Sequence, residues 1–324
     1  MDWTVPCYCR LPDPDFEIPV DDFYLPVIRL PEELLSERLQ GERVHLHALL
    51  GFVAPPGNIK RIPASYMLAR AVETGLLQAG DTLVEPTSGN MGLSLAYCAT
   101  RYRVTVAALV SDSLPQGKLL ALQRHGARVV KESDALAYLG LTTSPGCIEL
   151  ARRYAKTTDA VFLNQYANAW NPESYATLVA PALWEQIGGS ASLFVSAVGS
   201  TGTLIGIGGF LKNKNPAIEI VATMPHPGQS IGGTRDAERL KEIRHDWRAL
   251  DPVIQPIDQA AALAASRLLD DAGIPGGPSS GAAFGAAEQF LLDRLAAGTL
   301  DALRGDDGTI GVILPFADTV YPYG

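Results

Sequence analysis

The sequence contains 324 residues with a formal net charge of −9, and 47% of its residues are apolar while 19% are charged. This composition is typical of a well-packed globular protein with one large domain or two medium ones. The acidic balance and the lack of a basic patch argue against nucleic acid and against an anionic membrane as partners. No apolar run approaches the roughly 18 residues of a membrane span, and no signal peptide is recognisable at the N-terminus.

The four cysteines are predicted to be reduced thiols. They stand at positions 7, 9, 98 and 147, too few and too scattered for a disulfide framework in a chain of this size. Cys7 and Cys9 could bind a metal, but no second pair completes a site. We therefore expect free thiols, no metal, and a reducing cytoplasm as the compartment.

The N-terminal region combines an arm with strand-like segments. Residues 1–20 are rich in Pro and Asp and look extended. Strands are predicted over 22–30 and 44–50, with a short helix over 31–35 between them.

Two histidines, His45 and His47, share one face of the strand predicted at 44–50. A metal pair is one interpretation. Because no third ligand is near in the sequence, two ordinary sheet histidines are several times more frequent, roughly, than a metal site. We therefore expect no metal here either.

From residue 63 onward, helices and strands alternate along the chain. Near-continuous apolar runs such as 104–110 are typical of parallel strands buried on both faces. The alternation predicts βαβ units and two α/β halves that meet near residues 165–170, while residues 229–251 are predicted to be irregular and at the surface. The predicted strands are the beginning of 81–92, 104–110, 127–130, 160–165, 192–198, 218–224 and 310–315, and the predicted helices are 63–74, 93–99, 114–125, 148–156, 173–188, 204–212, 258–272 and the segment from the 276–281 turn to about 297.

A polar turn joins strand to helix within residues 81–92. Thr87, Ser88, Gly89 and Asn90 form this turn, at the start of an apolar helix. A helix N-terminus presents unpaired backbone N–H groups and the positive end of the helix dipole, which favours a carboxylate or a phosphate. Ser and Asn are also the commonest helix caps, so an anion socket and an ordinary cap both stay open.

A second polar turn consists of Gly199, Ser200, Thr201, Gly202 and Thr203, again between a strand and a helix. Glycines let backbone amides approach an anion, and the hydroxyls add donors. The turn lacks the Gly-Lys-Ser/Thr ending of a P-loop and the acidic residue that completes a dinucleotide fingerprint. It is interpreted as a phosphate cup, with a plain tight turn as the alternative.

Two further segments carry chemically useful side chains. Lys60 follows Gly57-Asn58-Ile59 at the start of a helix, where a lysine could form a Schiff base with an aldehyde cofactor. Ser279, in Ser279-Ser280-Gly281, opens the last long helix. Taken alone, each is weak, because most lysines are solvated and serine is a common cap.

Together, these four segments occur in the order and spacing of a known family. The chain resembles the fold type II pyridoxal phosphate (PLP) enzymes, and within them a divergent member of the cysteine synthase (O-acetylserine sulfhydrylase) and cystathionine β-synthase branch. The likeness covers roughly residues 24–316, is strongest over 75–90, and includes the stretch 165–173. It implies a tryptophan synthase β-like α/β fold with mostly parallel sheets flanked by helices and PLP in the cleft between two domains.

The resemblance also implies domain limits and cofactor contacts. The smaller domain would cover 50–166 and carry the Thr-Ser-Gly-Asn loop, and the larger, PLP-anchoring domain would cover 1–49 plus 167–324. Lys60 matches the lysine that holds PLP as an internal aldimine and later removes the substrate Cα proton. The remaining cofactor contacts implied are Asn90 to the 3′ oxygen, Gly199, Ser200, Thr201, Gly202 and Thr203 to the phosphate, and Ser279 to the pyridine nitrogen.

The substrate positions match less well than the cofactor positions. Thr87, Ser88, Gly89 and Gln165 match the groups that hold the substrate carboxylate. Met91 stands where the family usually has a substrate-contacting Thr, and a thioether cannot donate as a hydroxyl does. Further departures are Arg61-Ile62-Pro63 after the lysine, Tyr175 for a usual His, and Phe316 for a usual Ser or Asp.

The resemblance implies an enzyme of amino-acid metabolism. We expect β-replacement on an activated L-serine-type amino acid through an aminoacrylate, with a small amino-acid substrate and a nucleophilic co-substrate whose identity stays open. The alternatives are a β-elimination lyase or dehydratase, and a catalytically weak PLP-binding relative that acts by interaction. Members of the family are mostly homodimers, which is the expectation here.

Overall fold

The structure is a computed structural model that describes residues 24–323. The predictions made for the N-terminal arm, for Cys7 and for Cys9 therefore lie outside the described residues. Within 24–323, no helix combines the length and the apolar character that crossing a membrane requires.

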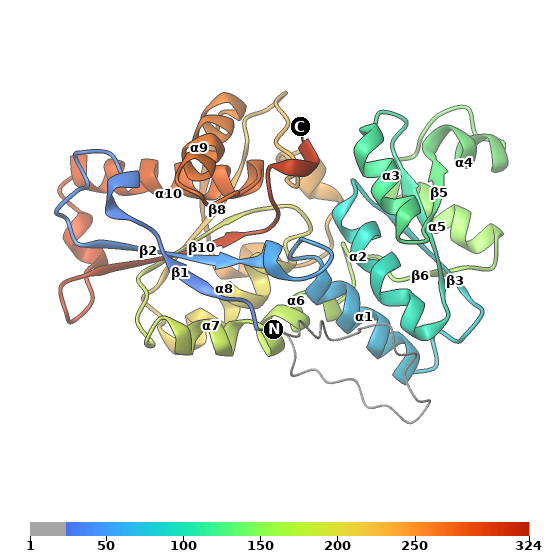
Figure 1. The fold of residues 1–324 in the computed structure, drawn as a ribbon, viewed down its shortest axis with the longest axis horizontal. Coiled ribbons are helices and arrows are strands. Elements are labelled where there is room, and N and C mark those ends of the chain that lie inside the picture. The colour runs from blue at the N-terminus through green and yellow to red at the C-terminus, as the bar shows by residue number, and fades with distance from the viewer. Residues whose placement is uncertain (1–23, 324) are drawn as a thin grey trace, which may run out of the picture.

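Two separate sheets organise the chain (Figure 1), and this confirms the predicted α/β class with mostly parallel sheets. The larger sheet has six strands in the order β1-β2-β10-β7-β8-β9, and the smaller has four in the order β5-β4-β3-β6. Among the strands within residues 24–323, only β1 pairs antiparallel, with β2, and every other strand pairing is parallel. The strands are β1 (Val27–Arg29), β2 (Val44–Leu50), β3 (Thr82–Pro86), β4 (Thr105–Val110), β5 (Arg128–Lys131), β6 (Val161–Phe162), β7 (Leu193–Ala197), β8 (Glu219–Pro225), β9 (Val253–Ile257) and β10 (Ile310–Phe316).

Helices cover both faces of each sheet (Figure 1). The α-helices are α1 (Arg61–Glu73), α2 (Asn90–Ala99), α3 (Gln116–Arg124), α4 (Glu132–Tyr138), α5 (Cys147–Thr157), α6 (Trp170–Leu178), α7 (Ala180–Gln186), α8 (Gly202–Lys214), α9 (Gln259–Asp271) and α10 (Pro278–Ala296). Single-turn 3-10 helices occur at Glu32–Leu34, Gly51–Val53, Thr100–Tyr102, Arg239–Glu242, Trp247–Leu250, Leu300–Leu303 and Tyr321–Tyr323.

Alternating side chains of each central strand supply two different cores. Successive residues of a strand point to opposite faces. In β7, Phe194 belongs to the core shared with α6, α7 and α8, whereas Leu193 and Val195 belong to the core shared with α10. In β4, Val106 belongs to the core shared with α1 and α2, whereas Ala107 belongs to the core shared with α5. Burial on both faces explains why these strands are almost entirely apolar.

The two halves of the chain divide between the two sheets. All four strands of the smaller sheet lie between residues 82 and 162, and the larger sheet combines β1 and β2 with strands that follow residue 193. We call these the smaller half and the larger half. The exact domain limits, 50–166 against 1–49 plus 167–324, stay a prediction.

Two predicted elements are interrupted, each by an identifiable residue. The single helix predicted over 173–188 is two helices, α6 and α7, because Pro181 in the first turn of α7 has no N–H to continue the first helix. The strand predicted over 160–165 ends after Phe162, since Asn164 turns the chain with a left-handed φ of 56°.

One α-helix and one strand were not predicted from the sequence. Helix α4 follows β5 directly, with no loop to mark its start. Strand β9 lies at the edge of the larger sheet and contains Pro256, a residue type that usually interrupts a strand. A proline is tolerated on an edge strand because one side of that strand needs no ladder hydrogen bonds.

The crossing of α9 and α10 gives a test of the packing. A Cβ on Gly281 of α10 would collide with the Ala262 carbonyl of α9 and come within 2.5 Å of the Ser266 nitrogen. We expect Gly281→Ala to lower the free energy of unfolding by about 1–3 kcal/mol, measured by urea denaturation. The control is Gly209→Ala in α8, where the nearest atom is 4.0 Å away and removing a helical glycine is neutral or mildly stabilising. Equal stability of the two variants would contradict this packing.

Candidate active site

The loop before α1 is held rigidly, and this fixes Lys60. The Asn58 side-chain oxygen accepts the backbone N–H of Lys60 at 3.0 Å and the Ser94 hydroxyl at 2.9 Å. The backbone N–H of Ile59 donates to the Ala317 carbonyl, just after β10, at 2.7 Å. The lysine backbone is therefore tied both to α2 and to the end of the last strand.

The amine of Lys60 is less basic than an ordinary lysine. The surrounding protein desolvates its ammonium and lowers the pKa to about 8, while the negative charge of Asp318 acts in the opposite direction. A pKa near 8 leaves part of the amine neutral at the pH of a cell, and only the neutral amine is a nucleophile or a base.

The polar turn after β7 ends at the N-terminus of α8. Thr201 has a left-handed φ of 65°, which is unusual for a β-branched residue, and α8 starts at Gly202. The first N–H groups of a helix have no partner within it, and they point toward the turn. The Asn171 side chain donates to the Ser200 hydroxyl at 3.1 Å and so supports the turn from α6. This geometry suits a phosphate.

One pocket collects most of the residues expected to hold PLP. Among them, Lys60, Ser200 and Ser279 come from three segments that are far apart in the sequence. The full lining is Ile59, Lys60, Ser196, Ala197, Gly199, Ser200, Thr201, Thr203, Leu204, Gly233, Ser279, Pro315 and Ala317. Gly202 belongs to the same turn as the first residue of α8.

The Ser279 hydroxyl provides a test of whether the pocket fits PLP. Ser279 is the second residue of α10, and its Oγ is buried without a hydrogen-bond partner among the described residues. A buried hydroxyl left unpaired is costly, so its position in the pocket lining indicates a missing polar partner. A bound PLP with its phosphate at the α8 turn and its aldehyde at Lys60 would supply one through its ring nitrogen. The residues present fit the cofactor.

Comparison with known proteins decides the family. The chain matches the model of the family described as "pyridoxal-phosphate dependent enzyme" over residues 25–302.

The chain belongs to this family. It is 34% identical to cysteine synthase B of Pseudomonas aeruginosa over 286 residues, which cover 87% of this chain and 91% of the relative. The fold is similar to that of the O-acetylserine-dependent cystathionine β-synthase of Helicobacter pylori, with a TM-score of 0.75, 24% identity, and coverage of 93% and 94% of the two chains. It is also similar to cysteine synthase of Entamoeba histolytica, with a TM-score of 0.76, 21% identity, and coverage of 96% and 90%. The chain is thus a cysteine synthase-like, PLP-dependent enzyme.

In this PLP-dependent enzyme, the Thr-Ser-Gly-Asn loop joins β3 to α2. The Thr87 hydroxyl accepts the backbone N–H groups of Gly89 and Gly92, each at 3.0 Å, so its oxygen shapes the loop. Gly89 has a φ of 129°, a conformation that side chains disfavour. Ser88 is exposed and leaves its hydroxyl available. The carboxylate-binding role of Thr87, Ser88 and Gly89 stays a prediction.

A buried carboxylate, Glu85, sets the position of Gln165. Glu85 lies at the end of β3 and accepts the backbone N–H groups of Asn164 at 3.0 Å and Gln165 at 2.9 Å. The Gln165 side chain donates back to the Pro86 carbonyl at 3.3 Å. Burial raises the pKa of Glu85 to about 7, although both N–H donors act to lower it. The sequence analysis missed Glu85, because an acidic residue inside an apolar strand has no signature of its own.

Asn90 contacts a residue that the sequence analysis also missed. Its side-chain amide donates to the Asp318 carboxylate at 2.6 Å. Asp318 is buried and follows β10. Ligands of parallel α/β sheets bind outside the carboxyl ends of the strands, so an acidic residue just past the last buried strand was the signal that could have revealed it.

Three of the positions that depart from the family pattern, Met91, Tyr175 and Phe316, have buried side chains. Met91 belongs to the buried cluster of the smaller half, and Phe316 to the core between the larger sheet and α10. Tyr175 is fully buried, and its hydroxyl donates to the Ile59 carbonyl at 3.4 Å, directly before Lys60. Met91 therefore packs as a core residue, and the substrate contact assigned to this position stays a prediction.

The buried Glu85 predicts a pH dependence of stability. Its pKa is about 7 in the folded protein against a reference of 4.5. At a pH between these two values, the carboxyl group is therefore mostly deprotonated in the unfolded chain and mostly protonated in the folded protein. The free energy of unfolding should therefore fall as pH rises from 5 to 7, by on the order of 2–3 kcal/mol for this residue. Urea denaturation at pH 5, 6 and 7 should show a smaller fall in the free energy of unfolding for Glu85→Gln. Glu185→Gln, at an exposed residue of α7, should leave the fall unchanged. Parallel curves for wild type and Glu85→Gln would refute the assignment.

Proposed function

We propose that this enzyme catalyses β-replacement on an activated L-serine-type amino acid, in which a nucleophile takes the place of the leaving group on Cβ. The observation that carries the proposal is that Lys60, the turn before α8 and the unpaired Ser279 hydroxyl line one pocket. The similarity to cysteine synthase B of Pseudomonas aeruginosa over most of both chains supports the same reaction class. The predicted homodimer and the predicted cytoplasmic location stay predictions.

The cofactor supplies an electron sink for the electron pair left at Cα. The amine of Lys60 would hold the cofactor at rest and would accept the Cα proton during turnover, because its low pKa keeps part of it neutral. Ser279 is neutral, so it can donate a hydrogen bond to the ring nitrogen without protonating it. An unprotonated ring is the weaker electron sink, which suits elimination of a β-substituent.

Two anion sites would orient the substrate. The turn before α8 would hold the phosphate, and the loop Thr87–Gly89, with Gln165, would hold the amino-acid carboxylate. Fixing two anions at once aligns the Cα–H bond with the base and removes the entropy cost of finding that alignment. Lys60 is the base in this arrangement.

The reaction class can be tested with a small substrate panel. O-acetyl-L-serine, O-phospho-L-serine and L-serine would each be mixed with sulfide, a thiol or an amine, and the amino-acid products identified by mass spectrometry. A β-substituted amino acid whose identity follows the nucleophile supports the proposal. Release of a keto acid regardless of nucleophile would indicate β-elimination, and absence of turnover across the panel would indicate a binding relative. Either result would overturn β-replacement.

The role of Lys60 predicts the behaviour of its alanine variant. Lys60→Ala should lower the turnover rate by a factor on the order of 10²–10⁴, because the base is lost, and should remove the absorbance band that comes from the covalent link between Lys60 and PLP. The control is Lys156→Ala, a change at an exposed residue of α5, which should leave both unchanged. A Lys60→Ala protein with wild-type absorbance and rate would exclude this lysine.

A further inference from the structure

Asp318 is held in place by two separate segments, the turn before α10 and the lysine loop. Its backbone forms a bridge with Asn58, and its carbonyl accepts the Gly277 N–H at 2.9 Å. Any side chain at Gly277 would collide with the Asp318 carboxylate, so the carboxylate fills the space above that glycine. The turn before α10 and the lysine loop therefore both fix the position of this side chain.

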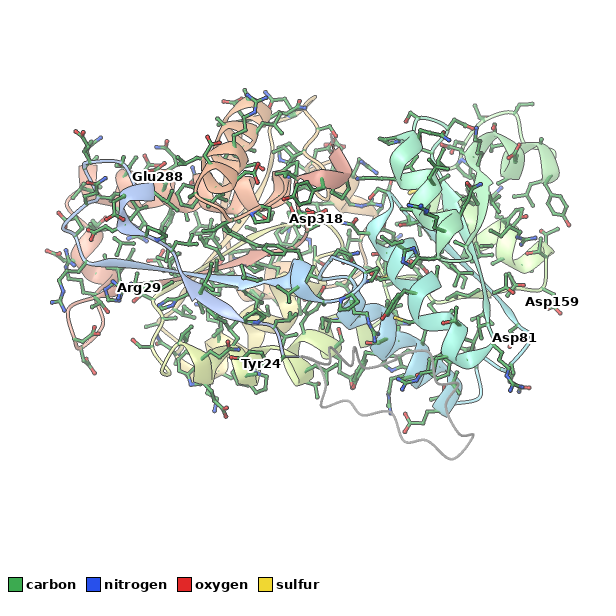
Figure 2. All side chains as sticks on the ribbon, in the orientation of Figure 1. Tyr24, Arg29, Asp81, Asp159, Glu288 and Asp318 are labelled. Atoms are coloured by element: carbon green, nitrogen blue, oxygen red, sulfur yellow. The ribbon has the colours of Figure 1, made fainter. Side chains whose placement is uncertain are left out.

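The Asp318 carboxylate reaches from the larger half to the smaller half. Figure 2 places Asp318 on the side of the larger half that faces α2. There it accepts the Asn90 amide, at the first residue of α2, at 2.6 Å. Its charge also acts on Lys118, whose aliphatic stem packs 3.1 Å from the position of a Cβ on Gly89.

Asp318 is the charged group that acts on Lys60. It raises the proton affinity of that amine against the effect of desolvation. None of the other residues that line the pocket with Lys60 carries a charge. Loss of the charge at position 318 should therefore lower the proton affinity of Lys60.

We propose that Asp318 is a positioning residue that holds Asn90 across the boundary between the two halves and places a negative charge beside the loop that carries Lys60. The first action fixes the orientation of the Asn90 side-chain amide at the start of α2. The second action sets the proton affinity of the reactive amine. The proposal rests on the proposed function only in treating Lys60 as that amine.

Two variants separate the two actions. Asp318→Asn keeps an oxygen that can accept the Asn90 amide but removes the charge, whereas Asp318→Ala removes both. The matched control is Asp159→Asn, at an exposed residue on the far edge of the smaller half (Figure 2) whose φ of 51° an asparagine tolerates. Circular dichroism verifies that each variant is folded, and Asp318→Asn keeps the test valid should Asp318→Ala fail to fold.

The charge is tested by the proton affinity of Lys60 in the full chain freed of PLP. The measurement is the pH midpoint of Lys60 acylation by a trace amine reagent, determined peptide by peptide by mass spectrometry. Asp318→Asn should lower the midpoint by about one unit, because an opposite charge nearby no longer favours the ammonium. Asp159→Asn should leave it unchanged. A wild-type midpoint in Asp318→Asn would overturn the electrostatic role.

The hold on Asn90 is tested by amide hydrogen exchange at the start of α2. Gly92 and Leu93 donate within this turn to Thr87 and Gly89, so their exchange reports its opening. Asp318→Ala should speed their exchange about tenfold, and Asp318→Asn should leave it close to wild type. Wild-type exchange in Asp318→Ala would overturn the positioning role. Neither readout depends on turnover, so failure of the proposed reaction would leave both measurable.

Discussion

The hydrogen bond from the Ile59 N–H to the Ala317 carbonyl, 2.7 Å long, is the contact on which the site depends. It joins the loop before the reactive lysine to the end of β10, the strand that runs through the middle of the larger sheet. Because β10 is buried along its whole length, its end cannot move without disturbing the core. The loop that carries Lys60 is therefore held in place by the buried sheet.

The two predicted anion sites are both helix N-termini. Helix α8 follows β7 in the larger half, and α2 follows β3 in the smaller half. Each helix begins just past the carboxyl end of a parallel strand, where an anion would gain from hydrogen bonds to the first N–H groups and from the helix dipole. The amide of Asn90 and the carboxylate of Asp318 then connect the two halves at 2.6 Å. This contact brings the start of α2 in the smaller half next to the segment that follows β10 in the larger half.

The sequence was sufficient wherever the signal is local. The glycine- and hydroxyl-rich turn after β7 and the lysine in Gly-Asn-Ile-Lys were both recognised locally, and in the structure they line one pocket; their roles toward PLP stay predictions. Asp318 was missed because its role depends on a partner, Asn90, that is 228 residues away in the chain. Strand β9 was missed because Pro256 breaks the usual pattern of a strand, and only the position at the sheet edge makes it acceptable. The sequence did not show that the Met91 side chain lies in the buried cluster of the smaller half, and its substrate contact stays a prediction.

The central claim is that Lys60 is the amine that holds PLP. The most direct test is to load the protein with PLP, reduce it with borohydride, digest it, and locate the phosphopyridoxyl group by peptide mass spectrometry. The account predicts that the modified peptide contains Lys60. A label on another lysine, or no covalent label on a protein that binds PLP, would contradict it.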